Sequence, residues 1–162
     1  SGYSKGAYVA SIATGLAFSR GAKNKPQVAW LFSPAGADIS AIKSLPIDFG
    51  MNIVKAEDDK TVKPQFAEQI YAESKVQFKQ LITLMSYRVT NPQLIADHFW
   101  TLSKASSFGG NGESSFHHYG LWKWLGGAAE DLRQGGKFQN EYAYGVKSLD
   151  KGLPGLSDRK FP

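Results

Sequence analysis

The chain has 162 residues, a formal net charge of +5 and no cysteine, and 42% of its residues are hydrophobic. This length suits one domain with an ordinary core, so we expect a single domain over residues 1–162. The absence of cysteine excludes disulfides, thiolate nucleophiles and thiolate metal sites. The sequence has no apolar run of transmembrane length and no visible signal peptide, and it does not fix the compartment. Ser1-Gly2 could be a processing or cloning scar, and we do not expect it to belong to the fold.

The N-terminal third is expected to hold both helices and strands. Apolar side chains in residues 8–17 recur at helical spacing and predict a helix that buries them. Val28–Phe32 is a short apolar run typical of a buried strand. Asp38 is suited to cap a short helix. Alternation over residues 47–54 predicts a strand with one buried face, followed by an acidic turn at residues 57–60.

The rest of the chain is expected to be mainly helical. Spacings of three and four predict a helical hairpin near residues 64–104, whose second helix begins at Asn91-Pro92. A third helix is predicted near residues 115–134, and a late strand near residues 138–146. The tail from about residue 151 is expected to be irregular. The predicted fold is α+β, with about three principal helices on a small sheet of N-terminal strands plus the late strand.

Basic residues gather at the N-terminal end, where no acid precedes Asp38. The cations of this segment are Lys5, Arg20, Lys23 and Lys25. Such an end favours phosphate, an anionic membrane or an acidic protein as partner. Lys75 and Lys79, one turn apart on the predicted long helix, could extend the same phosphate-binding face. The alternative is that these residues only supply solubility charge.

The third predicted helix carries an unusual pattern of glycine and tryptophan. Gly120, Trp124 and Gly127 share one face, and each helical glycine costs about 0.5–1 kcal/mol relative to alanine. That cost suggests close approach by a ligand or another backbone. We expect Trp124 to be exposed and to anchor a second subunit, another copy or a nucleic-acid base, with Trp122 in the core. The alternative is close packing within the domain.

His117 and His118 offer the strongest candidate for catalysis. They could act as general base and acid in phosphodiester cleavage, with Lys123 stabilising the developing charge. Adjacent helical residues point about 100° apart, however, so both histidines cannot easily face one substrate. Neither the histidines nor Glu57-Asp58-Asp59 shows the spacing of a metal site, and no cofactor-binding motif is present. We therefore expect no metal and no cofactor.

These patterns favour a non-catalytic binding or assembly subunit. It would use its basic N-terminal third and the Gly120/Trp124/Gly127 face to dock on nucleic acid, an anionic surface or another protein. The alternative is a small metal-independent ribonuclease or toxin-type hydrolase that uses His117 and His118. An inhibitor or immunity-type protein is a third possibility, although inhibitors of nucleases are more often acidic.

Overall fold

The computed structural model describes residues 1–86, 88, 93–102, 117, 121–133 and 157–160. The fold is α+β, as predicted. Its elements in chain order are β1 (Gly2–Tyr3), α1 (Lys5–Ser19), β2 (Val28–Phe32), α2 (Ile39–Lys43), β3 (Gly50–Ala56), α3 (Gln65–Glu73), β4 (Phe78–Leu84), α4 (Trp122–Arg133) and β5 (Ser157–Lys160).

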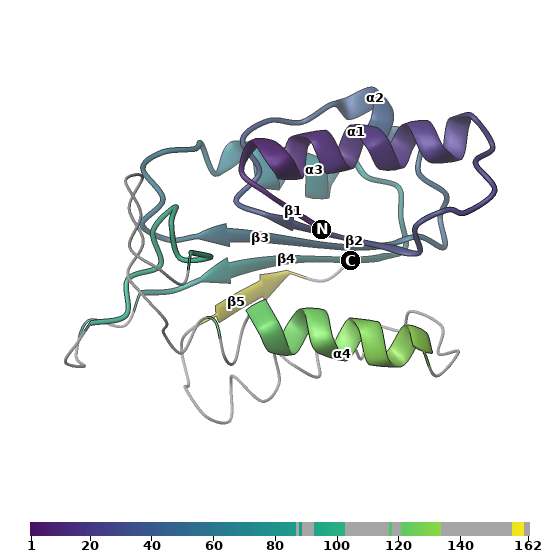
Figure 1. Ribbon diagram of the computed structural model, residues 1–162. Coiled ribbons are helices and arrows are strands. Elements are labelled where there is room, and N and C mark those ends of the chain that lie inside the picture. The colour runs from purple at the N-terminus through teal and green to yellow at the C-terminus, as the bar shows by residue number, and fades with distance from the viewer. Residues whose placement is uncertain (87, 89–92, 103–116, 118–120, 134–156, 161–162) are drawn as a thin grey trace. The chain divides into compact units, whose positions relative to one another are not determined.

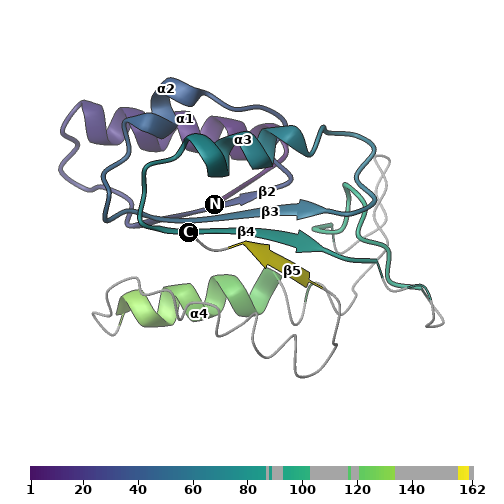
Figure 2. The same ribbon diagram turned by 180° about the vertical axis from the view of Figure 1, so that it is seen from behind.

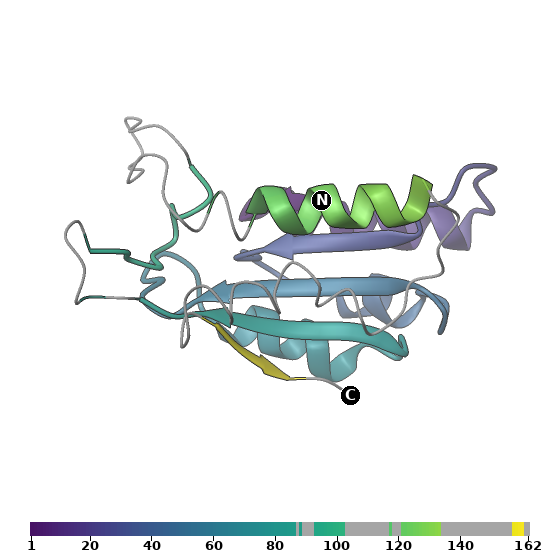
Figure 3. The same ribbon diagram turned by 90° about the horizontal axis from the view of Figure 1, so that it is seen from below.

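The strands form one sheet in the order β1-β2-β3-β4-β5. β1 pairs in parallel with β2, with Gly2 opposite Leu31, and β2 pairs in parallel with β3, with Val28 opposite Gly50. Strand β4 runs in the same direction as β3 (Figure 1), and Figure 3 shows β2, β3 and β4 side by side. Each helical crossover leads to the next strand along, and crossovers share one hand. Helices α1, α2 and α3 therefore cover the same face of the sheet (Figures 1 and 2).

The chain divides into two compact units. The first is formed mainly by Ser1–Lys55 and Thr61–Ile82, and the second contains Ala56–Lys60 and most of the chain after Thr83. The core of the first unit lies between its helices and the sheet and includes Ala7, Leu31, Ile42, Met51, Ile53, Ile70 and Leu81. The single domain that the sequence leads us to expect over residues 1–162 stays a prediction.

Helix α1 packs closely on its neighbours through small residues. A Cβ on Gly15 would lie 2.9 Å from the Cβ of Ala41 in α2, and a Cβ on Gly2 would lie 2.3 Å from the carbonyl oxygen of Gly6. The buried residues of α1 are Ala7, Ser11, Thr14 and Gly15. The helix predicted at residues 8–17 is thus confirmed, but its expected buried face is wrong. Gly2, which the sequence did not lead us to place in the fold, is the first residue of strand β1.

The elements up to β3 follow the sequence patterns. Val28–Phe32 is a strand, as predicted. Asp38 caps α2 through a 3.0 Å hydrogen bond from the Ala41 N–H to Oδ1, and this bond lowers the pKa of Asp38. The next strand starts at Gly50, three residues later than predicted, and it is buried on both faces rather than one.

The predicted helical hairpin near residues 64–104 is wrong. Helix α3 ends at Glu73 because Ser74 is extended, and Phe78–Leu84 is strand β4. The described residues from 93 to 102 contain no helix. The error arises because a strand buried on both faces has a nearly continuous apolar run, which also satisfies spacings of three and four.

The C-terminal predictions have mixed outcomes. The third helix is confirmed as α4 over Trp122–Arg133. The late strand predicted near residues 138–146 lies outside the described residues. The tail holds strand β5 at Ser157–Lys160, so the prediction of an irregular tail is wrong for these residues.

Candidate ligand-binding pocket

The loops that follow parallel strands meet at one edge of the sheet, where such folds bind ligands. At this edge Ser4 follows β1 and Ser33 follows β2, with φ angles of 54° and 43°. The Ser4 N–H donates to the carbonyl of Phe32 over 2.9 Å, and the Ser4 carbonyl accepts from Ala35 N–H over 3.2 Å. These bonds hold two left-handed turns side by side. Such turns in residues other than glycine are uncommon.

A pocket of about 510 Å³ opens next to these turns. Its walls come from the β1–α1 junction and from the segment that leads into α3. The lining residues are Tyr3, Ser4, Lys5, Gly6, Ala35, Thr61, Val62, Lys63 and Phe66. All of them belong to the first unit. The volume lies within the range of small-molecule sites, roughly 300–1,000 Å³.

The pocket is suited to an anion. Among the described residues, Lys5 and Lys63 line it, no carboxylate does, and neither lysine forms an ion pair. Gly6 is exposed, and a Cβ built there would meet no atom within 4 Å. The Ser4 side chain makes no capping hydrogen bond to α1, and the pocket lies at the N-terminal end of this helix. Helix N-terminal N–H groups carry partial positive charge. The walls also offer Val62 and Phe66 to an apolar group.

The other predicted basic residues lie away from this pocket. Arg20, Lys23 and Lys25 follow the C-terminus of α1, and the Lys25 ammonium lies 5.6 Å from the centre of the Phe18 ring. Lys75 is exposed between α3 and β4. Helix α1 separates Lys5 from Arg20 by about 22 Å, at 1.5 Å per residue. The structure thus divides the predicted basic face between two ends of one helix.

Lys79 has a structural position rather than the predicted helical one. It lies on β4, and its Nζ donates to the carbonyls of Tyr71 and Ser74 over 2.8 and 2.7 Å. Burial lowers the pKa of Lys79. Because these carbonyls lie at the end of α3, the ammonium group stabilises the helix C-terminus. Lys79 and Lys75 therefore do not share a helical face.

The environments of the two α4 tryptophans are the reverse of those predicted. Trp124 is only 2% exposed, and its ring packs edge to face on that of Trp100 with 6.5 Å between the ring centres. Trp122, in contrast, is 44% exposed. Helical residues two apart point about 200° apart, so one buried face cannot hold both indoles. Gly120, the side chain of Lys123 and the surroundings of Gly127 lie outside the described part of the chain. Trp124 is therefore buried and cannot serve as the exposed anchor of the predicted docking face.

The histidine pair is only partly described. His117 is 1% exposed, and its ring centre lies 6.0 Å from that of Trp122. A polymer substrate cannot reach a side chain buried to this extent. His118 lies outside the described residues.

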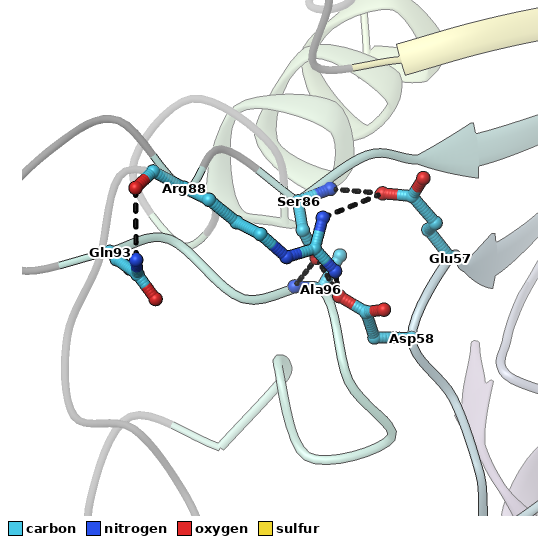
Figure 4. Close-up of polar contacts among 6 residues, drawn as sticks. All are labelled: Glu57, Asp58, Ser86, Arg88, Gln93 and Ala96. Atoms are coloured by element: carbon cyan, nitrogen blue, oxygen red, sulfur yellow. Dashed lines mark hydrogen bonds and ion pairs between the residues drawn. The ribbon is translucent and has the colours of Figure 1, made fainter.

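The acidic turn after β3 holds a polar network rather than facing water alone (Figure 4). The Ser86 N–H donates to Glu57 Oε2 over 2.8 Å, while the Ser86 hydroxyl and the Arg88 guanidinium both donate to Asp58. The Ser86 oxygen accepts from Ala96 N–H over 2.9 Å. These bonds tie the turn to the segments around residues 86 and 96.

A buried ion-pair geometry extends the same turn. His98 Nδ1 lies 2.7 Å from Asp59 Oδ2, and both side chains are buried. His98 lies within the range of the predicted helical hairpin, but it is not on a helix and instead contacts the acidic turn through Asp59. Within the part of the chain that the structure describes, no cluster of histidine and carboxylate side chains could hold a metal ion.

Sequence comparison gives no relative from which a role could be transferred. No family model matches the chain, and no curated protein shows significant similarity to it. Among the described residues, no helix is both long and apolar enough to cross a membrane. The sequence does not predict the pocket, because the two residues of β1, Gly2 and Tyr3, are too few to show the pattern of a strand. Only a strand at that position places Ser4 and the first residues of α1, Lys5 and Gly6, at the edge of the sheet.

Proposed function

We propose that this chain is a non-catalytic binding domain whose ligand is a small molecule with a phosphate or carboxylate group. The ligand occupies the pocket between residues 3–6 and 61–66. The observation that carries this proposal is the charge of the pocket: of the residues that the structure describes, Lys5 and Lys63 line it and no acid does. An anion is the ligand that offsets two such cations.

The pocket chemistry supports binding rather than catalysis. In the described part of the chain, its lining contains neither a carboxylate nor an imidazole, which are the usual general bases. The apolar side chains Val62 and Phe66 favour a ligand that joins an apolar group to its anion. The hydrolase alternative gains no support, because His117 is buried.

Phenyl phosphate tests this proposal, with inorganic phosphate and phenol as probes for the two halves of the ligand. Isothermal titration should show the order phenyl phosphate, then phosphate, then phenol, because only the first satisfies both walls. Lys63→Ala should weaken phenyl phosphate binding by about tenfold or more, since a hydrogen bond to a charged group contributes about 1.5–3 kcal/mol. Lys75→Ala removes an equal charge outside the pocket and should leave affinity unchanged.

A second variant tests the position of the site. Gly6→Leu places a side chain where a Cβ meets no neighbour within 4 Å, so the fold should persist while the pocket fills. We expect circular dichroism to be unchanged and phenyl phosphate binding to be lost. Equal affinity of the parent, Lys63→Ala and Gly6→Leu proteins would show that the ligand binds elsewhere.

A further inference from the structure

The outer face of α1 is apolar in its middle and basic at its ends. Val9 is 61% exposed and Leu16 is 43% exposed, although both are large aliphatic residues. Spacings of three and four place them on one stripe, which comprises Lys5, Val9, Ala13, Leu16 and Arg20. All five residues are exposed. We call this surface the α1 stripe.

The stripe is the reverse of what a surface helix normally presents. The fully buried residues of α1 are the small residues Ala7, Ser11, Thr14 and Gly15, whereas Val9 and Leu16 are exposed. Surface helices usually turn their apolar side to the core and their polar side to water. Val9, Ala13 and Leu16 are aligned on one exposed face, so together they offer apolar area to a partner.

The charge around the stripe identifies the kind of partner. Residues 1–37 contain no acid, and Lys23 and Lys25 lie exposed just beyond Arg20. Cations thus lie at both ends of an apolar segment on a helix about 22 Å long. A complementary partner presents negative charge on both sides of an apolar region.

We propose that the α1 stripe docks on an anionic lipid surface. A helix that lies flat on a bilayer places its aliphatic side chains below the headgroups, while its lysine and arginine side chains contact lipid phosphates. Nucleic acid explains the cations but not Val9 and Leu16, because aliphatic side chains neither bind phosphate nor stack on bases as aromatic ones do. The α1 stripe shares Lys5 with the proposed ligand pocket, but Val9 and Leu16 do not line that pocket.

Vesicle sedimentation with the full chain tests the proposal. The protein should bind vesicles of phosphatidylglycerol and phosphatidylcholine and fail to bind phosphatidylcholine alone. Leu16→Glu, which removes the apolar contact, should weaken binding by about tenfold or more. The double change Arg20→Glu and Lys23→Glu should weaken it at least as much, because each basic residue near an anionic surface contributes to attraction. High salt should release the protein.

Two matched variants separate the stripe from general properties of the protein. Ile47→Glu changes an aliphatic residue that is 66% exposed but lies between α2 and β3, and it should bind vesicles like the parent. Lys75→Glu alters the net charge at a site away from α1, and it should also bind like the parent apart from a small general decrease. Circular dichroism of all variants checks that they are folded.

Other outcomes would overturn the proposal. Equal binding to neutral vesicles, no binding to anionic vesicles, or an equal loss in Ile47→Glu and Leu16→Glu would each show that the stripe is not a lipid-docking surface. Salt-sensitive binding to duplex DNA or RNA that survives Leu16→Glu, without vesicle binding, would assign the cations to nucleic acid instead.

Discussion

Helices α1 and α4 bury different kinds of side chain. Helix α1 buries glycine, alanine, serine and threonine and leaves Val9 and Leu16 in solvent. Helix α4 buries the large indole of Trp124 and leaves that of Trp122 exposed. In both helices, residues that the sequence places in the core are exposed: Val9 and Leu16 in α1, and Trp122 in α4.

The difference shows that backbone separation determines which side chains a helix buries. At Gly15 helix α1 lies so close to α2 that a Cβ would be 2.9 Å from Ala41, and no aliphatic side chain fits there. Trp124 instead lies beside Trp100 with 6.5 Å between ring centres, a separation typical of edge-to-face packing. Small residues therefore indicate a buried face where helices pack closely.

The largest expected effect concerns the indoles of α4. Trp124→Ala should destabilise the protein by about 3–5 kcal/mol, because it leaves a cavity beside Trp100. Trp122→Ala should cost less than about 1 kcal/mol, because that side chain is 44% exposed. Urea denaturation of both variants measures the difference. Equal losses in the two variants would show that both indoles contribute to the core.

The second effect concerns close packing of α1. Gly15→Ala should destabilise by about 1–3 kcal/mol, the usual cost of overpacking, although alanine favours helix formation. Thermal unfolding should show a lower Tm than in the parent. A stability equal to or greater than that of the parent would mean that α2 shifts to accommodate the added methyl group.

The local elements could be predicted where the sequence pattern had one solution. Val28–Phe32 is short, apolar and bounded by turns, and Asp38 is a residue that caps helices well; both predictions are confirmed. Strand β4 is not predicted because side chains on both of its faces are buried, including Leu81, Ile82 and Leu84. An apolar run of this kind fits the spacing of a helix equally well. Its correct assignment requires knowledge of the neighbouring strand.

The candidate site could be predicted only in part. The basic N-terminal segment was recognised, yet Lys5 and Lys63 are far apart in the sequence and meet at the pocket only through the parallel sheet. Lys79 is predicted on a binding face because it lies four residues from Lys75 on an expected helix. Its actual partners, the carbonyls of Tyr71 and Ser74, are backbone groups that a pattern of side chains does not reveal. Burial of His117 and Trp124 likewise depends on tertiary packing.

The smallest expected effect also tests whether the two glycines of α1 have different roles. Gly6→Ala should stabilise the protein by about 0.4–1 kcal/mol, because the added methyl meets no atom within 4 Å and restricts the unfolded chain. The backbone φ of Gly6 is not positive, so alanine can adopt it. Thermal unfolding of Gly6→Ala and Gly15→Ala should therefore give shifts of opposite sign.

The same variant connects stability with the pocket. The methyl group of Gly6→Ala projects from a residue that lines the pocket, so we expect slightly weaker phenyl phosphate binding together with the higher Tm. Glycine at this position would then be maintained for ligand approach at a small cost in stability, a trade-off common at binding sites. A gain in stability with unchanged affinity would mean that the ligand does not approach the Gly6 backbone. A loss of stability would mean that Gly6, like Gly15, is required for packing.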